Sequence, residues 1–404
     1  MRILLVNQAF YPDVVATAQY LTDAALALQK AGHVVTVVSW RRGYVEPHPL
    51  YPPKETYRGV KIIRVWPFAL GRTKKIFRVL DACCLNLAFL IRILFLPRFD
   101  CIVALTSPPL VGLMALLVAR FKKSRFVYWV MDLNPDEAIE MGWIKREALS
   151  ARFLGSSLRY ILKHSHQIVA LDRFMKERLV DKGAQASKIS VIAPWPHEEL
   201  VAVSHEENPF RKQRGLENKF VVMYSGNHSV CHPLDTLLEA ALVLKDDSKI
   251  VFLFIGGGAR VADVLAFKEK HGLENIQMLP YQERAMLKYS LSAADVHVAV
   301  MGERMVGIVH PCKIYGVLQL GKPFIYIGPA ASALNDLAQK AGVGFSLRHG
   351  NIAGVTQAIL KVRSLNLQDL KGIAAAEMEC AEEFSARHLI PQLQTILTIG
   401  LNRP

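Results

Sequence analysis

The stretch Ile250-Val251-Phe252-Leu253-Phe254-Ile255-Gly256-Gly257-Gly258-Ala259-Arg260 decides the fold class of this chain. Its six consecutive apolar residues predict a strand that is buried on both faces of a parallel sheet. The glycines that follow predict a tight turn, and the periodicity of 261–271 predicts a helix after it. The glycine spacing does not follow Gly-x-Gly-x-x-Gly, and the turn is not the first of its series. We therefore expect a tight turn beside a nucleotide pocket rather than a dinucleotide fingerprint.

The same order of strand, loop and helix recurs along the whole chain. Apolar runs predict the strands of a first domain at 3–6, 34–38, 61–65, 101–105, 125–131, 167–171 and 188–192. Those of a second domain are predicted at 220–224, 250–255, 276–279, 295–300 and 323–327. Continuous apolar strands that alternate with helices indicate parallel sheets covered on both faces. We expect two doubly wound α/β domains, 1–195 and 217–380, joined by a polar linker over 196–216. Ligands in such sheets bind beyond the carboxyl ends of the strands, so a cleft between the domains is the expected site.

Charge is unevenly distributed between the two halves. The 404 residues contain 49 Lys and Arg against 35 Asp and Glu, a formal net charge of +14. Residues 1–200 hold 28 of these basic and 16 of these acidic residues, so nearly all of the excess lies there. A basic first half predicts an anionic partner, for which a membrane face is the leading candidate; a generic basic surface is the alternative. Nucleic acid is not expected, because no known reader motif accompanies the charge.

The cysteines and the N-terminus indicate the compartment. The six cysteines are scattered and show no metal-ligand spacing, so no metal site is predicted and a reducing cytoplasm is expected. The apolar run at residues 3–6 is too short for a signal peptide and is expected to be a buried first strand.

The segment Val79–Pro97 does not fit an ordinary soluble helix. Its 19 residues are nearly all apolar, but Asp81 and Arg92 count against a membrane-spanning helix. Basic residues precede it, among them Lys74, Lys75 and Arg78, and Arg98 follows it. We predict a helix that lies on anionic lipid; a core helix of the first domain is the alternative.

Two stretches of the second domain suit a phosphate-bearing ligand. Gly226, followed by Asn227 and His228, ends the predicted strand 220–224 and allows the backbone to approach a ligand. Pro311 suits the first position of a helix predicted over 312–320, where Lys313 adds a full positive charge to the helix N-terminus. Gly307 lets the preceding loop fold close to a ligand. Together these features predict a diphosphate site.

Acidic residues follow a buried strand of the first domain. Asp132 comes directly after the strand predicted to end at Met131, and Asp136 and Glu137 follow in the same loop. Carboxylates at the carboxyl end of a strand suit recognition of sugar hydroxyls or catalysis. Solvated loop acids are the alternative.

Taken in order, these pieces resemble the retaining glycosyltransferases of family 4, which have the GT-B fold. The resemblance spans nearly the whole chain. It rests on Phe10-Tyr11-Pro12-Asp13, Asp132–Glu137, Tyr224-Ser225-Gly226-Asn227, Gly256-Gly257-Gly258, and Pro311–Tyr315 followed by Gly321-Lys322-Pro323. The Tyr-Ser-Gly-Asn and Pro-Cys-Lys pieces are typical of the branch that assembles bacterial capsule, exopolysaccharide and O-antigen.

The resemblance implies that a sugar moves from a nucleotide-diphosphate donor to its acceptor with retention of anomeric configuration, without a metal or another cofactor. Lys313 would stabilise the leaving diphosphate, whose oxygen would take the acceptor's proton. The implied fold has two Rossmann-like domains that face each other across a cleft, and the C-terminal helix at 381–404 returns to the first domain. The implied acceptor is a polyprenyl-diphosphate-linked glycan, which places the protein in the cytoplasm at the inner face of the plasma membrane.

Lys313 and Asp132 are the candidate catalytic residues. The candidate substrate-binding residues are Thr17, Gly226, Asn227, His228, Gly257, Arg260, Tyr281, Gly307, Ile308, Val309 and His310. Two departures from the family bear on this set. The first loop has Val14-Val15-Ala16-Thr17 where many members have two glycines, and the family's glutamate pair aligns with Ile308 and Gly316. Lys313 remains as the cation of the motif, and Arg260 is a candidate to compensate.

Two other functions fit the same fold. A nucleotide-sugar 2-epimerase also uses two such domains, and it would convert the donor without an acceptor. A non-catalytic membrane scaffold derived from the fold would bind a partner transferase, which the missing glutamates favour.

Overall fold

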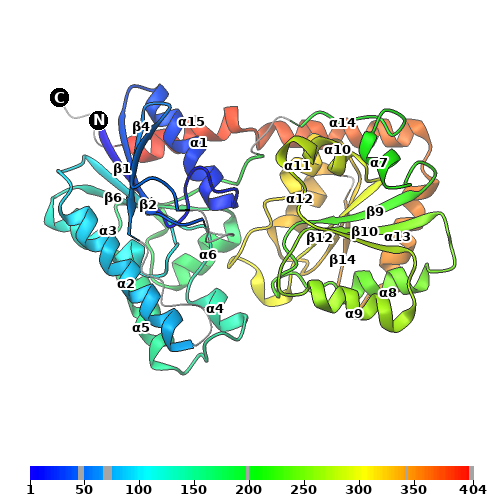
Figure 1. The fold of residues 1–404 in the computed structure, drawn as a ribbon, viewed down its shortest axis with the longest axis horizontal. Helices are drawn as coiled ribbons and strands as arrows, with labels where there is room; N and C mark the ends of the chain where they lie inside the picture. Colours follow the sequence, from blue (N-terminus) through cyan, green and yellow to red (C-terminus); the bar gives the residue numbers. More distant parts are fainter. Residues whose placement is uncertain (44–49, 67–74, 197–199, 343, 400–404) are drawn as a thin grey trace. The chain divides into compact units, whose positions relative to one another are not determined.

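The computed structural model describes residues 1–43, 50–66, 75–196, 200–342 and 344–399, which form two compact units. The first unit comprises residues 1–197, 307–310 and 386–404, and the second comprises 198–306 and 311–385. In each unit helices cover both faces of a largely parallel sheet (Figure 1).

The first unit is built on an eight-stranded sheet of order β3-β4-β2-β1-β5-β6-β7-β8. Its strands are β1 (Arg2–Val6), β2 (Val34–Trp40), β3 (Lys54–Tyr57), β4 (Val60–Val65), β5 (Cys101–Ala104), β6 (Arg125–Trp129), β7 (Gln167–Ala170) and β8 (Ile189–Val191). All neighbours pair in parallel except β3, which is antiparallel to β4 at the edge. Sequence reasoning missed β3, because the polar run Lys-Glu-Thr-Tyr lacks the apolar signal of the buried strands.

Helices cover this sheet on both sides. They are α1 (Ala16–Lys30), α2 (Lys75–Leu94), α3 (Val111–Phe121), α4 (Asp136–Glu140), α5 (Leu149–His164), α6 (Arg173–Asp181), α15 (Ala386–Thr398) and the short η1 (Ala186–Lys188). Helix α3 packs against α2 and α5, whereas α1 packs against α15 (Figure 1). After β1, β5, β6 and β7, which run parallel, the chain turns toward a helix, so the loops after these strands share one edge of the sheet.

The structure answers in part whether the apolar segment 79–97 is a core helix. Its buried residues Leu85, Phe89 and Ile93 lie four positions apart, and the helix packs against α3, β2 and β4. The opposite face stays apolar and exposed, however, so the core-helix reading accounts for one face only. Among the described residues, no helix has the length and the apolarity that crossing a bilayer requires. Residue 74 and the side chains of Lys75 and Arg78 lie outside what the structure describes.

The second unit is built on a six-stranded parallel sheet of order β11-β10-β9-β12-β13-β14. Its strands are β9 (Phe220–Ser225), β10 (Ile250–Ile255), β11 (Ile276–Leu279), β12 (Val296–Val300), β13 (Phe324–Ile327) and β14 (Phe345–Leu347). Its helices are α7 (Pro209–Gln213), α8 (Asp235–Val243), α9 (Val261–His271), α10 (Leu287–Ser292), α11 (Ile314–Gln319), α12 (Ala333–Ala341), α13 (Ile352–Ser364), α14 (Leu367–Glu383) and the short η2 (Arg284–Met286) and η3 (Glu303–Met305).

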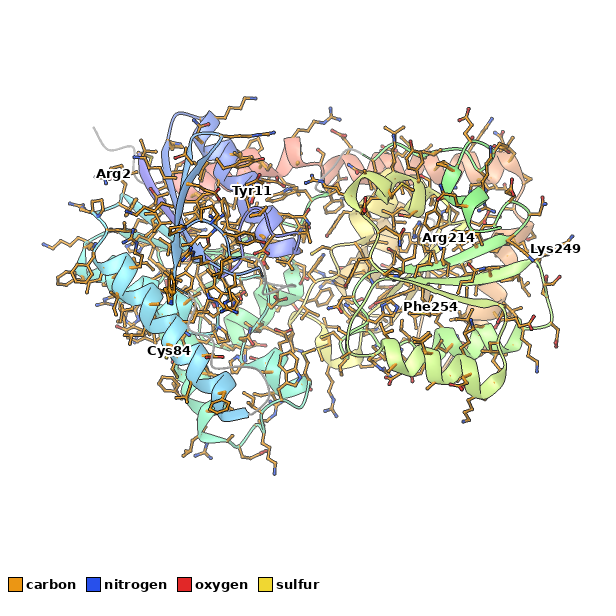
Figure 2. The ribbon with its side chains drawn as sticks, in the orientation of Figure 1. Arg2, Tyr11, Cys84, Arg214, Lys249 and Phe254 are labelled. Carbon is orange, nitrogen blue, oxygen red and sulfur yellow. The ribbon has the colours of Figure 1, made fainter. Side chains whose placement is uncertain are left out.

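Strand β10 shows why its apolar run is continuous. Phe252 and Phe254 point into the core formed with α8, α9 and α13, whereas Val251 and Leu253 point into the core formed with α7 and α10. Because successive side chains alternate between the two faces, both faces need apolar residues. Phe254 lies inside the first of these cores (Figure 2).

The segment expected to be a polar linker belongs mostly to the second unit. Residues 200–216 fold with that unit, where Asn208 caps α7 by accepting a hydrogen bond from the Phe210 amide at 3.0 Å. Arg211 is buried and donates to the carbonyls of Ala293 and Leu216, each at 2.6 Å. Arg211 is thus a charged side chain that caps backbone carbonyls in the interior. The sequence alone does not distinguish such a residue from a solvated one.

The chain passes between the units later than expected near its C-terminus. Helix α14 extends to Glu383 with Cys380 and Ala381 buried in the second unit, and α15 of the first unit begins at Ala386. The Phe384 ring packs on the Tyr315 ring at 4.9 Å between centroids, which holds the end of α14 to the second unit. The expected boundary at 380 therefore lies five residues too early.

Candidate active site

Two strand-ending glycines bring backbone close together in the second unit. Gly226 follows β9 with φ +140° and Gly256 follows β10 with φ +135°, a region that favours glycine. The Gly226 amide donates to the Ile255 carbonyl at 2.8 Å. A Cβ placed on Gly256 would lie 2.1 Å from the Gly226 carbonyl oxygen. The two turns can approach this closely only because neither residue has a side chain.

Lys313 lies against these turns. Its Nζ is 3.7 Å from the centroid of the Tyr224 ring, and a Cβ on Gly226 would lie 3.0 Å from the same Nζ. The Nζ is buried and has no hydrogen-bond partner among the described residues. The Tyr224 face offers a cation–π contact but no charge. Lys313 is therefore a buried amine with no counter-ion among the residues that the structure describes.

Burial acts on the protonation of this cluster. It lowers the pKa of Lys313 to about 7, because the buried ammonium loses its hydration. Burial, followed by the charge of Lys313, also lowers the pKa of His228 and brings that of His232 to about 3. The His232 Nδ1 lies 2.7 Å from the Val300 carbonyl, so this nitrogen carries the proton of the neutral ring. Both imidazoles are thus held neutral beside the amine.

The helix predicted over 312–320 starts later than expected. Lys313 is the N-cap of α11, which begins at Ile314, and Pro311 lies ahead of the helix rather than in its first position. The Tyr315 amide bonds the Cys312 carbonyl three residues back at 3.3 Å, so residues 312–313 form a tight turn. Within this segment, the Lys313 side chain is the part that lies in the candidate site.

Arg260 pairs with two acidic neighbours at the start of α9. Its guanidinium donates to Asp263 at 2.7 Å and to both oxygens of Asp235 at 3.3 Å. These partners raise its pKa, the hydrogen bond with Asp263 contributing most. That Arg260 compensates for lost contacts to the ligand stays a prediction, and these two pairs would have to open for it to do so.

The other candidates of the second unit lie around the same turns. The His228 amide donates to the Gly257 carbonyl at 2.8 Å, and Asn227 approaches Gly258 closely enough to exclude a Cβ there. Tyr281 follows β11, is 58% exposed, and places its hydroxyl 3.4 Å from the Gly257 carbonyl. An exposed aromatic ring beside a strand-end turn offers a stacking surface for a planar group.

In the first unit, Asp132 follows β6 as expected. Its amide donates to the Thr106 hydroxyl, which follows β5, at 3.3 Å. Burial raises the pKa of Asp132 to about 6, and burial together with the charge of Asp132 raises that of Glu137 to about 7. Asp136 instead pairs with Lys182 at 2.7 Å. Two carboxyl groups of raised pKa at one sheet edge mark a candidate site.

A third acidic residue, Asp172, lies at this edge of the first sheet and contacts a residue that is distant in the sequence. Asp172 follows β7, caps α6 by accepting from the Met175 amide at 2.8 Å, and lies 2.7 Å from Nδ1 of His310. Sequence reasoning missed Asp172, although it follows its strand just as Asp132 does. This position was the signal that could have identified it.

Residues 307–310 therefore lie with the first unit. The Ile308 carbonyl accepts from the Leu133 amide at 2.8 Å, and a Cβ on Gly307 would lie 2.6 Å from the Phe174 carbonyl. Val309 is buried in the same segment. We expected these residues to act together with Lys313, but the structure assigns the two groups to different units. Thr17, in the first turn of α1, is half-buried.

Two doubly wound α/β units with strand-end sites are the architecture of GT-B glycosyltransferases. The solved structure of Anabaena HepE in complex with UDP-glucose is similar over 98% of this chain and 99% of that chain, with a TM-score of 0.71 and 14% identity. Residues 16–195 match the glycosyl transferase 4-like domain.

Two curated relatives are also similar. WbjE of Pseudomonas aeruginosa, named as a glycosyltransferase, is 24% identical over 291 residues, 70% of each chain. WcaI of Escherichia coli K12, named as a glycosyl transferase of colanic acid biosynthesis, is 25% identical over 260 residues, 60% of this chain and 62% of that one. These comparisons support a glycosyltransferase of the family 4 type, with the GT-B fold. The fold and the family predicted from its motifs are confirmed.

Proposed function

We propose that this enzyme transfers a sugar from a nucleotide-diphosphate sugar to a lipid-linked glycan during the synthesis of a bacterial surface polysaccharide. The observation that carries the proposal is the buried amine of Lys313, which has no partner among the described residues and lies beside the Gly226 turn. A diphosphate supplies the missing negative charge. The name of WcaI and the UDP-glucose bound to HepE support the same class of substrates.

The reaction needs charge stabilisation at the leaving group. As the bond from the anomeric carbon to the diphosphate breaks, negative charge develops on the departing oxygen, and Lys313 in its protonated form stabilises it. That oxygen then takes the proton of the attacking hydroxyl on the same face of the sugar, which retains the anomeric configuration. No protein base is required for this step.

A thermal-shift screen tests the proposal. UDP, UDP-sugars, GDP and GDP-sugars are added to the purified protein, and a ligand that binds the folded state raises its melting temperature according to its affinity. We expect at least one nucleotide sugar to do so and to be consumed when a membrane extract is added. Conversion of the donor to a new nucleotide sugar without acceptor would instead indicate an epimerase. Binding without transfer to any acceptor would indicate a scaffold.

On the acceptor side, we propose that Asp132 accepts a hydrogen bond from a sugar hydroxyl. Asp132→Asn is expected to lower kcat/KM for the acceptor by about 10–100-fold, because a hydrogen bond to a charged group contributes roughly 1.5–3 kcal/mol. With a pKa of about 6, the carboxylate forms as the pH rises through 6. Wild-type kcat/KM should therefore rise over pH 5–7, and the rise should shrink in Asp132→Asn.

The control for this variant is Asp136→Asn, since that carboxylate already pairs with Lys182. Both variants should keep the melting shift caused by the donor. Equal kcat/KM for the acceptor in Asp132→Asn and wild type would remove Asp132 from the site.

We further propose that the enzyme docks on the cytoplasmic membrane face through α2. Leu87 and Ile91 of α2, and Phe95 directly after it, are 55%, 47% and 81% exposed, and they follow one another at intervals of four on the side away from the buried face. Replacing all three by serine is expected to lower partitioning into anionic vesicles by about 100-fold or more, because burying one such side chain contributes roughly 1.5–3 kcal/mol. Since the three are exposed, the melting temperature should stay near that of wild type.

Vesicle sedimentation at moderate salt measures this effect. The matched control replaces exposed apolar residues of the second unit, Val243 and Leu265, by serine. Full co-sedimentation of the triple variant, or an equal loss in the control, would contradict docking through α2.

A further inference from the structure

A cavity of about 700 Å³ lies at the edge of the first sheet that the candidate site does not use. Its wall includes the first residues of β6 and β7, Arg125 and Gln167. Asp132 and Asp172 follow the other ends of these strands. The cavity is therefore separate from the carboxyl-edge site, with the length of the strands between them.

The charged residues in the wall all carry one sign. Arg120, Lys123 and Arg125 line the cavity, and no carboxylate of the described part of the chain does. None of the three has an ion-pair partner among the residues that the structure describes. Three cations that share a hollow with no counter-ion among the described residues make a strongly positive site.

Hydrogen-bond donors without acceptors line the same space. Ser124 is 5% exposed, and its hydroxyl has no partner among the described residues. One guanidinium nitrogen of Arg125, Nη2, donates to the Ile396 carbonyl at 3.2 Å, while its buried Nη1 has no described partner. His166 accepts the Phe126 amide on Nδ1 at 3.1 Å, so Nε2 carries the proton of the neutral ring. Buried donors in proteins nearly always have an acceptor, which an anion here would supply.

Lys123 has a backbone conformation that favours glycine. Lys123 follows α3 with φ +52°, in the left-handed region that glycine adopts at low cost. In this conformation Lys123 lines the cavity between Arg120 and Arg125.

We propose that this cavity binds a phosphate group. Arginine and lysine are the side chains that recognise phosphate oxygens, and the serine hydroxyl and imidazole add neutral donors. The remaining wall includes the apolar side chains of Leu116, Phe126 and Ile399, which would contact an apolar part of the ligand. A lipid headgroup and a free phosphate both present the required chemistry. The site is independent of donor binding, since every residue used belongs to the first unit.

Calorimetric titration with two soluble probes, inorganic phosphate and monomeric dihexanoyl phosphatidic acid, tests the proposal. We expect phosphate-group binding in the full-length protein and a loss of at least about 10-fold in affinity in the double variant Arg120→Gln/Lys123→Gly, since each charged contact removed weakens binding. Lys123→Gly suits the backbone, so the melting temperature should not fall. Ser124→Ala, measured separately, should weaken binding without removing charge.

The matched control is Arg58→Gly, which removes a cation from another left-handed position of the first unit, at φ +46°. Binding of the lipid phosphate alone would identify a headgroup as the source, and binding of inorganic phosphate alone a free phosphate; either supports the site. No binding of either probe at millimolar concentration, or an equal loss in Arg58→Gly, would overturn it. Because the double variant should keep the melting shift caused by nucleotide sugars, failure here is distinguishable from failure of the proposed function.

Discussion

Lys313→Met is expected to lower turnover by about 10²–10³-fold, the loss typical of removing a group that stabilises charge on a leaving oxygen. The same substitution is expected to raise the melting temperature of the unliganded protein. Methionine has a similar volume and packs against the Tyr224 ring, but it needs no counter-ion. A residue that activity needs and stability does not is characteristic of a ligand site.

The dependence of stability on pH makes this prediction sharper. Burial lowers the pKa of Lys313 from 10.5 to about 7 in the folded protein, which corresponds to roughly 4–5 kcal/mol. Between these values the unfolded chain binds a proton that the folded chain does not. The free energy of unfolding attributable to this group should therefore rise as the pH increases from 7 to 10.5. The rise should be absent in Lys313→Met.

Chemical denaturation at pH 7, 8, 9 and 10 measures this difference, and a transfer assay measures turnover. Lys340→Met is the control, because that ammonium pairs with Glu383 at the surface. Unchanged turnover in Lys313→Met would exclude a role for the amine in the reaction. A parallel pH dependence in wild type and Lys313→Met would show that the amine is hydrated rather than buried.

Gly256→Ala is expected to destabilise the second unit by about 3 kcal/mol or more and to abolish the melting shift caused by the donor. The new Cβ would lie 2.1 Å from the Gly226 carbonyl oxygen, and φ is +135°, so both turns must move. Because Lys313 lies on the Gly226 turn, this movement also displaces the amine.

Gly272→Ala is the matched control for this prediction. Gly272 also has a positive φ, +59°, but nothing lies within 4 Å of a Cβ there, so the cost is limited to roughly 1 kcal/mol of backbone strain. Calorimetry with and without the nucleotide sugar distinguishes the two variants. If Gly256→Ala melted at the same temperature as Gly272→Ala and kept the melting shift caused by the donor, the two turns would be able to separate without loss of stability or binding.

Much of the second unit could be predicted because its signals are local. The apolar run of β10 is continuous since both faces of that strand are buried, and Gly226 and Gly256 end their strands as predicted. Asp132 likewise follows a strand whose burial is visible in its composition. The polar edge strand β3 has no such signal, because its side chains are exposed or half-buried and need not be apolar.

Local sequence patterns could not predict which side chains contact each other in the fold. Arg260 and Asp235 are 25 residues apart, and their contact follows from how α8 and α9 pack. Arg211 looks solvated in sequence but is buried, because the carbonyls that it caps come from other segments.

The sequence by itself determined the two doubly wound units, their strand-end turns and the family, since burial pattern and glycine position are properties of neighbouring residues. Only the tertiary structure decided that His310 meets Asp172, 138 residues away, that Lys313 has no described counter-ion, and that Arg120, Lys123 and Arg125 share a hollow. Charge pairs and cavities depend on which distant segments of the chain come together in the fold. Local sequence patterns do not specify those contacts.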